Sequence, residues 1–222
     1  MNLINFINAF FSDSAHWTGY DGIPTRVGEH IQYTLQALVL AAAIGLPVGL
    51  ITGHTGRGGN ALSLIATAGR ALPTFGLLVL MTLMLGFGLV NVMIPLIVLA
   101  VPPILVTTYE AMRSVDPSPV DAARGMGMSE AQVLFQVELP AALPLILSGL
   151  RSAAIQIVST ATIAAYVSLG GLGRYIVDGL YQRNYEKVVG GATLVAGLAL
   201  VTLALFWAVH RTAVSRGVRG SG

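Results

Sequence analysis

The sequence predicts an all-α, polytopic membrane protein with about five transmembrane helices. Of its 222 residues, 55% are hydrophobic and only 10% are charged, whereas a soluble domain carries about 25% charged residues. Four intervals lack Asp, Glu, Lys and Arg: 30–56, 71–109, 152–173 and 188–210. Each is long enough to cross the hydrocarbon layer, which takes about 20 mostly apolar residues. Proline and glycine interrupt the intervals, as they do in kinked membrane helices.

Residues 1–29 precede the first interval and are expected to form an extracytoplasmic or interfacial segment. Their apolar run, Leu3–Phe11, is too short to span the membrane, and no basic residue precedes it, which argues against a secretory signal. We expect this run to lie along the membrane surface.

The charge-free intervals predict five helices within a transmembrane domain at 30–210. The expected ranges are 30–53, 61–86, 90–112, 141–168 and 188–210. The second and third helices share one interval, and Gly86, Phe87, Gly88 and Asn91 favour a tight turn between them.

Basic residues orient these helices. Arg211, Arg216 and Arg219 follow the last helix, and positive charge near a span end favours the cytoplasm. Residues 211–222 are therefore expected to form a cytoplasmic tail. With five helices, the N-terminus is then outside, and so is the segment 170–187, whose own basic residues make the bias moderate.

The segment 114–140 differs from the apolar rest of the chain. Ser118 is a candidate helix cap, with Pro119 at the first helical position and Asp121 three residues after the cap. The Gly125 and Gly127 pair then predicts a turn.

A second short helix is expected after this turn. Ser129 and Gln132 have the spacing of a capping box, and the helix is expected to end before Pro140. A helix, a glycine turn and a helix also occur in DNA-binding units. The four acidic residues of this segment argue against phosphate contact and therefore against nucleic acid. A glycine- and alanine-rich surface instead fits close approach by another protein.

The residues of this segment resemble the coupling motif of permease subunits of binding-protein-dependent ABC importers. That motif reads Glu-Ala-Ala, three residues, Gly, nine residues, Ile-x-Leu-Pro. Both internal spacings match, and Asp replaces Glu and Val replaces Ile. The matching residues are Asp121, Ala122, Ala123, Gly127, Val137, Leu139 and Pro140. The resemblance extends from about His30 to the end of the last helix, and implies a type I importer fold with these residues contacting the ATPase.

Four short segments are most similar to permeases for osmoprotectants such as glycine betaine, choline and carnitine. They are Ala71–Thr74, Val115–Pro117, Gly125–Met128 and Gly170–Gly173. Permeases for methionine share much of this pattern, so an amino-acid cargo is the alternative.

The resemblance also implies the partners and the location. A second permease, identical or a sister chain, would complete the path, a cytoplasmic ATPase would drive it, and an extracytoplasmic binding protein would deliver the substrate. The membrane would be the bacterial inner membrane. ATP is expected to bind the partner, because the only lysine, Lys187, has no phosphate-binding sequence around it. We expect no catalytic group, metal or cofactor in this chain.

Few residues point to the transport path itself. Pro73, Gly170, Gly171 and Gly173 are candidates for the path or an outer gate. Arg70 and Arg151 are candidates for the cytoplasmic mouth, although long side chains near span ends also reach the headgroups.

An aromatic cage for a quaternary amine cannot be assembled from the sequence alone. The aromatic residues in or near spans are Tyr33, Phe75, Tyr109 and Tyr166. Two remote alternatives are an ion-coupled transporter, which needs ionisable groups at the midplane, and a membrane-anchored scaffold.

Overall fold

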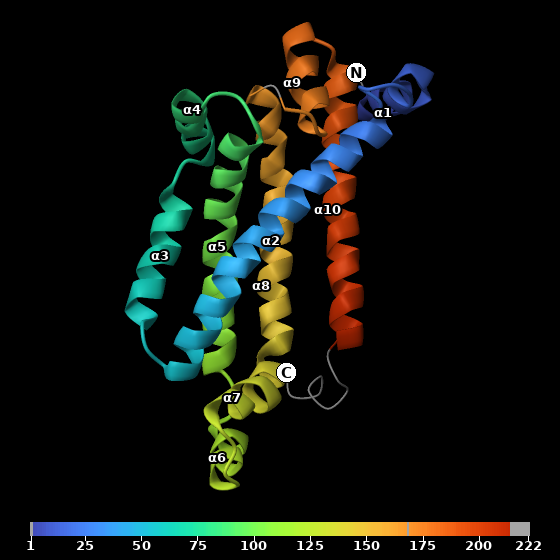
Figure 1. Ribbon diagram of the computed structural model, residues 1–222. Helices are drawn as coiled ribbons and strands as arrows, with labels where there is room; N and C mark the ends of the chain where they lie inside the picture. The colour runs from blue at the N-terminus through green and yellow to red at the C-terminus, as the bar shows by residue number, and fades with distance from the viewer. Residues whose placement is uncertain (1, 168, 214–222) are drawn as a thin grey trace.

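The computed structural model describes residues 2–167 and 169–213, and the side chains of Ser63, Ala66 and Arg70 lie outside this description. Within the described ranges the chain is helical and has no strand (Figure 1). The elements are α1 (Leu3–Ser12), η1 (Ser14–His16), α2 (Ile23–Thr55), α3 (Gly59–Ala71), α4 (Thr74–Leu85), α5 (Leu89–Arg113), α6 (Pro117–Gly125), α7 (Glu130–Gln132), η2 (Val133–Glu138), α8 (Leu139–Thr160), η3 (Ala161–Val167), α9 (Gly173–Gln182) and α10 (Tyr185–Ala213). The predicted all-α membrane class is confirmed.

Among the described residues, four helices are long and apolar enough to cross a membrane: α2, α5, α8 with its neighbouring turns, and α10. A fifth span is obtained when α3 and α4 are counted together. The expected ranges of the third and fifth helices agree with α5 and α10 to within three residues. Arg216 and Arg219, which helped to orient the chain, lie outside the described residues.

The first helix begins earlier than expected. It starts at Ile23 rather than His30, with Gly22 as its cap and a proline in its first turn, so the expected boundary at residue 29 falls inside α2. A charged first turn is tolerated because Arg26 is paired with Asp21 and Glu29.

The expected single helix at 61–86 is wrong. The chain is broken between α3 and α4, which are bent by 82° relative to each other. The cause is Pro73, which has no N–H for a helical hydrogen bond and disfavours helical backbone at the residue before it. Leu72 is extended, with ψ of 123°. Pro73 therefore divides the span instead of kinking it.

The two short helices of segment 114–140 exist, but two of their expected ends are wrong. Helix α6 is capped by Asp116, whose carboxylate accepts the N–H of Ser118 at 2.9 Å, so Ser118 is not the cap. The Ser129–Gln132 capping box is confirmed. The second helix does not end before Pro140, because α7 continues through the π-helical turn η2 into α8. The π turn ends at Glu138, two residues before Pro140, whose missing N–H interrupts the regular hydrogen-bond ladder over this stretch.

Close contact between α2 and α5 forms the centre of the bundle. Gly45, Gly49 and Gly53 recur every fourth residue on α2 and lie against Ile104, Thr108 and Met112 of α5. Small residues at such spacing let two membrane helices approach closely. Helix α8 packs against both α5 and α2, and the largest buried apolar cluster joins α2, α4, α5, α8 and η3.

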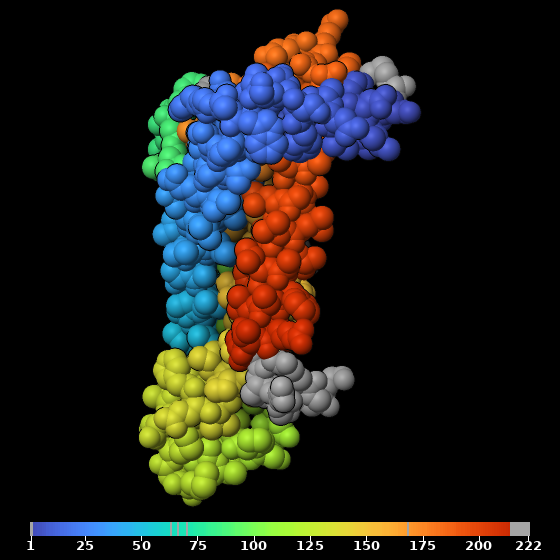
Figure 2. Space-filling view, turned by 90° about the vertical axis from the view of Figure 1, so that its right-hand side faces the viewer, coloured from blue at the N-terminus to red at the C-terminus, as the bar shows by residue number. Residues whose placement is uncertain are grey.

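Short helices gather at the two opposite ends of the bundle. At one end α6, α7 and η2 form a separate lobe, and at the other α1, the start of α2 and α9 gather (Figure 2). Helix α9 lies in the segment 170–187, for which the sequence predicted no helix. The expected apolar run at Leu3–Phe11 forms α1, which packs against α9 and α10 through Phe10 and Tyr175.

Candidate functional site

The coupling segment, residues 114–140, has a small apolar core of its own. Val120 and Ala123 of α6 pack against Val133 of η2, and all three are buried. Val137 and Met128 cover this cluster. The segment is therefore a folded lobe and not a loose loop. Ala123, expected at the contact with the ATPase, faces inward and contributes through internal packing.

The outer surface of α6 carries the exposed part of the motif. Asp121 and Ala122 are exposed, and Met126 is 78% exposed. Gly127 has φ of +85°, and a Cβ at this position would meet no neighbouring atom. Its backbone therefore requires glycine because of conformation and not because of crowding. Together these residues form a small knob at the tip of the lobe.

Ion pairs of Arg124 connect α6 to α7 across the glycine turn. Both Arg124 Nε and Nη2 donate to the Glu130 carboxylate at 3.0 Å, and Arg124 Nη1 lies 3.9 Å from Asp121. The bond to Glu130 raises the pKa of Arg124 above its ordinary value. The fork geometry of the guanidinium fixes α6 and α7 relative to each other more specifically than a single contact would.

A partly buried contact joins the coupling segment to α2. His54 Nδ1 lies 2.5 Å from Glu138 Oε2, and His54 Nε2 lies 3.3 Å from Glu130 Oε2. Glu138 is only 7% exposed, so His54 is the partner that compensates its burial. The C-terminal end of α2 is thereby attached to the lobe at two carboxylates.

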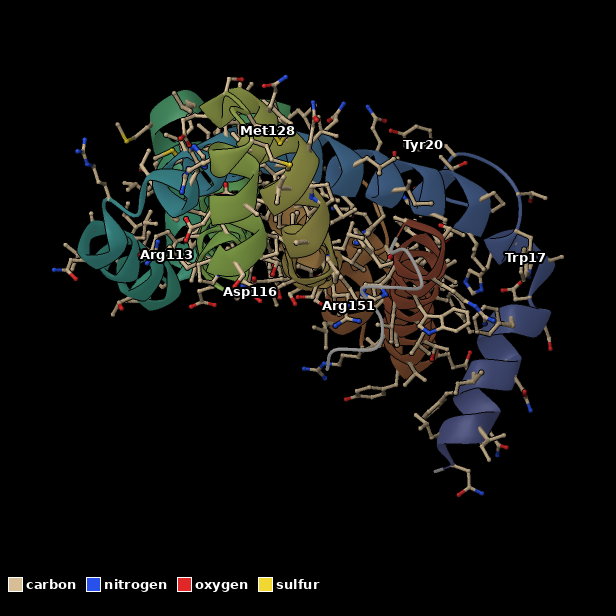
Figure 3. The ribbon with its side chains drawn as sticks, turned by 90° about the horizontal axis from the view of Figure 1, so that it is seen from below. Trp17, Tyr20, Arg113, Asp116, Met128 and Arg151 are labelled. Carbon is tan, nitrogen blue, oxygen red and sulfur yellow. The ribbon has the colours of Figure 1, made fainter. Side chains whose placement is uncertain are left out.

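The remaining motif residues connect the lobe to the membrane helix. Leu139 packs with Ala142 and Ile146 of α8 against the end of α5, and Pro140 lies in the first turn of α8. Figure 3 looks onto this end of the molecule and shows Asp116 and Met128 in the coupling segment. The motif therefore includes surface positions, core positions and the first turn of α8, and its contact with an ATPase stays a prediction.

Replacing His54 with Ala is expected to weaken the attachment of the coupling segment. Glu138 would be left buried without a partner, which costs about 1–3 kcal/mol. Amide hydrogen exchange in η2 is expected to accelerate, while His210→Ala, in the last turn of α10, leaves it unchanged. Equal exchange in both variants would show that the His54–Glu138 contact does not hold the lobe.

At the opposite end, the expected glycine turn packs against α2. The Gly171 N–H donates to Glu29 Oε2 at 2.7 Å, and Gly171 has φ of +86°. A Cβ on Gly170 would overlap the Glu29 carboxylate. The turn is thus fixed to the N-terminal part of α2 by a carboxylate that only a glycine backbone can approach so closely.

His30 contacts the same glycine turn from its buried side. It is fully buried, and its Nδ1 accepts the Leu172 N–H at 3.3 Å while Nε2 lies 2.8 Å from the Val158 carbonyl. Because Nδ1 accepts, the proton is on Nε2 and is donated to that carbonyl. Gly173 lies so close to Thr162 of η3 that a Cβ would overlap its backbone oxygen.

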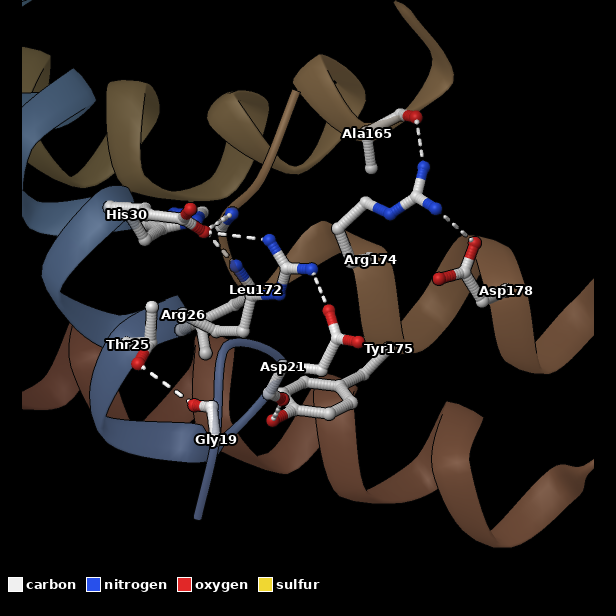
Figure 4. A network of polar contacts seen from close by, with 12 residues as sticks. Gly19, Asp21, Thr25, Arg26, His30, Ala165, Leu172, Arg174, Tyr175 and Asp178 are labelled. Carbon is white, nitrogen blue, oxygen red and sulfur yellow. Dashed lines mark hydrogen bonds and ion pairs between the residues drawn. The ribbon is translucent and has the colours of Figure 1, made fainter. Parts of the chain in front are cut away.

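Arg26 completes a polar network around the turn. Its guanidinium donates to Glu29 at 2.9 Å and also pairs with Asp21, as Figure 4 shows beside Tyr175. The Tyr175 hydroxyl donates to the Asp21 carbonyl at 2.6 Å. Burial raises the pKa of Tyr175 to about 12, so the hydroxyl stays protonated and available as a donor at neutral pH.

The path candidates lie on different elements of the bundle. Pro73 forms the break between α3 and α4, and the first turn of α4 brings Phe75 to Tyr166 of η3. The sequence did not predict this aromatic pair. Arg151 is half-buried on α8, whereas the side chain of Arg70 lies outside the described part.

The other two aromatic candidates are not part of that pair. Tyr33 is buried beside the glycine turn, and the Tyr109 ring lies against Gly59 at the start of α3. Neither has a ring contact with the other candidates among the described residues. The sequence also gave no indication that His54 and Glu138 meet, because 84 positions separate them.

Comparison with known proteins gives consistent relationships. The family model described as "Binding-protein-dependent transport system inner membrane component" matches residues 45–220. The carnitine transport permease protein OpuCB of Listeria monocytogenes is 30% identical over 195 residues, which cover 88% of this chain and 87% of that protein. The choline transport system permease protein OpuBB of Bacillus subtilis (strain 168) is 34% identical over 173 residues, 78% of this chain and 80% of that protein.

A solved structure supports the same fold. It is described as showing inward-facing conformations of the MetNI methionine ABC transporter. One chain of it superimposes with a TM-score of 0.74 at 25% identity, covering 86% of this chain and 95% of that one.

Proposed function

This chain belongs to the family of binding-protein-dependent transport system inner membrane components, and from that premise we propose how it works. It is the transmembrane permease subunit of an ATP-driven ABC importer in the bacterial inner membrane. Its cargo is a small osmoprotectant such as glycine betaine, choline or carnitine. A separate cytoplasmic ATPase binds and hydrolyses the ATP.

The observation that carries this proposal is the coupling segment. The motif lies on a folded lobe at one end of the bundle, with its knob exposed and its base attached to α2 and α8. A protein that binds the knob can therefore move two membrane helices. Asp121, Ala122 and Gly127 would contact the ATPase, and Ala123, Val137, Leu139 and Pro140 would hold the knob in position.

Helix α2 offers a mechanical connection between the two ends. It contacts the coupling segment through His54 and the glycine turn through Glu29 and His30. These contacts are 24 to 25 residues apart, or about 37 Å at 1.5 Å per helical residue. ATP binding to the partner biases two packings of the bundle if the ATPase contacts differ between them. Gly170, Gly171 and Gly173 would then act as an outer gate.

The proposed role places the coupling segment in the cytoplasm, which would put the N-terminus outside and the C-terminus inside. The count of basic residues supports this orientation moderately. Arg57, Arg113, Arg124 and Arg211 lie at the coupling end, and Arg216 and Arg219 follow in the sequence, whereas the other end has Arg26, Arg174, Arg183 and Lys187. An excess of Lys and Arg near span ends favours the cytoplasmic side.

The osmoprotectant cargo is supported by relatives whose names describe carnitine, choline and glycine betaine transport. A methionine-type cargo is the second candidate, and the similarity of the solved methionine transporter to this fold favours it. A second permease, an identical copy or a sister chain, and an extracytoplasmic binding protein complete the assembly in either case.

Reconstitution tests the function. Vesicles that contain this chain, its ATPase and its binding protein are expected to take up labelled glycine betaine only when ATP is supplied on the side of the ATPase. Unlabelled choline or carnitine should compete, and methionine should not.

Three outcomes would contradict the proposal in different ways. Competition by methionine alone would overturn the osmoprotectant cargo. Uptake driven by an ion gradient without ATP would overturn the importer mechanism. The chain has no cysteine, so Met126→Cys introduces a single thiol whose labelling reports the orientation of the coupling segment. Labelling of this thiol from the outside of intact cells would overturn the proposed topology.

A further inference from the structure

Helix α8 has a polar face within the membrane span. Ser148, Ser152, Gln156 and Ser159 follow one another at intervals of three or four residues, which places them on one side of the helix. The serine hydroxyls donate to backbone carbonyls three or four residues earlier. The Gln156 side chain is different, because it is exposed and has no hydrogen bond to any described residue.

The amide of Gln156 indicates what this face meets. An amide facing hydrocarbon without a hydrogen-bond partner is costly, so polar groups within a span face a cavity or another protein chain. The other side of α8 is buried by apolar contacts, including Ala153 and Ile157. Figure 3 places Arg151, at the edge of the polar face, on the side of the bundle away from α2. This side is where a water-filled path between two permease chains would run.

Two aromatic rings lie outward of Gln156. Tyr166 of η3 and Phe75 of α4 have ring centroids 5.3 Å apart and planes at 76°. They are 48% and 50% exposed. An edge-to-face pair leaves aromatic surface free on both rings. The break at Pro73 is what brings the first turn of α4 to η3.

The chemistry of this pair fits one kind of ligand. A quaternary ammonium group has no N–H to donate, and it is attracted to the face of an aromatic ring within about 6 Å of the ring centre. The interval 152–173, which contains the outer half of α8 and all of η3, has no Asp or Glu. A cation beside the aromatic pair therefore meets ring faces and no carboxylate from this interval.

We propose that Phe75 and Tyr166 form a cation–π transit site for the quaternary ammonium group of the cargo, at the outer part of the path. This inference rests on the proposed osmoprotectant function and names the residues that recognise the cargo within the membrane. The site consists of two half-exposed rings, so it holds the cation weakly. Weak binding suits a path, because a tightly held cargo would leave slowly.

Leucine substitutions test the site in the reconstituted importer. Phe75→Leu and Tyr166→Leu retain an apolar side chain but remove the ring. Each is expected to reduce glycine betaine uptake at saturating binding protein by roughly three- to tenfold, and the double variant by more. Tyr166→Phe and Phe75→Tyr keep the ring and should retain uptake. Phe87→Leu is the matched control, because Phe87 is also exposed, at 75%, but lies in the turn between α4 and α5.

The outcomes separate this inference from the function on which it rests. If the unaltered chain transports no quaternary amine, the proposed cargo fails first. If it does and both leucine variants transport equally well, the transit site is overturned while the function stands. If a leucine variant also loses ATPase stimulation by the binding protein, Phe75→Tyr and Tyr166→Phe distinguish a packing defect from the loss of the ring. Loss of uptake in these ring-retaining variants would show that packing causes the effect, and would overturn the transit site.

Discussion

Gly127→Asp is expected to abolish uptake while leaving the protein inserted in the membrane. The backbone at this position has φ of +85°, and a residue with a side chain pays about 1–2 kcal/mol for left-handed backbone. Aspartate visits this region more readily than most residues, so the added charge at the tip of the knob is the larger part of the expected effect. Because 1.4 kcal/mol corresponds to tenfold in an equilibrium constant, we expect ATPase association to fall at least tenfold.

The neighbouring glycine separates backbone from surface effects. A Cβ on Gly125 would also meet no neighbouring atom, but Gly125 does not have a positive φ. Gly125→Ala is therefore expected to retain association, and Gly127→Ala to weaken it through the backbone alone. Co-purification of the ATPase from membranes measures both. Normal association of Gly127→Asp, with normal uptake, would remove the docking role of the knob.

Gly173→Ala is expected to have the largest effect at the end of the molecule opposite the coupling segment. The added Cβ would overlap the backbone oxygen of Thr162, and backbone cannot move aside as the end of a flexible side chain can. Overpacking of this kind costs about 1–3 kcal/mol. We expect the contacts of the turn with Glu29 and His30 to be displaced and uptake to fall at least several-fold.

Gly197→Ala is the control for this substitution. Gly197 lies in α10, and a Cβ there would meet no atom within 4 Å, so its replacement should leave uptake unchanged. Thermal unfolding in detergent distinguishes a general loss of stability from a local change at the turn. If Gly173→Ala retained the uptake and the melting temperature of the unaltered chain, the close packing of the turn against η3 would be irrelevant to transport.

The wrong predictions at Pro73 and Pro140 have a common physical origin. Hydropathy located the spans because burial of about 20 apolar residues is a property of the local sequence. It did not give the 82° break at Pro73, because proline only removes a hydrogen bond and restricts the residue before it. Whether a helix then kinks or divides depends on what each half packs against, here Leu78 of α4 in the core with α5. For the same reason Pro140 did not end its helix.

The sequence by itself determined the membrane class, the spans to within a few residues in most cases, and the motif with its glycine at the turn. These follow from local composition and spacing, which the chain contains before it folds. The tertiary structure alone decided that His54 meets Glu138, that Glu29 and His30 hold the glycine turn, that Ala123 faces inward, and that Phe75 meets Tyr166. Except for Ala123, whose direction depends on the packing of the lobe, these contacts join residues more than 80 positions apart. No periodicity encodes such pairs, because the packing of the helices chooses which of their side chains meet.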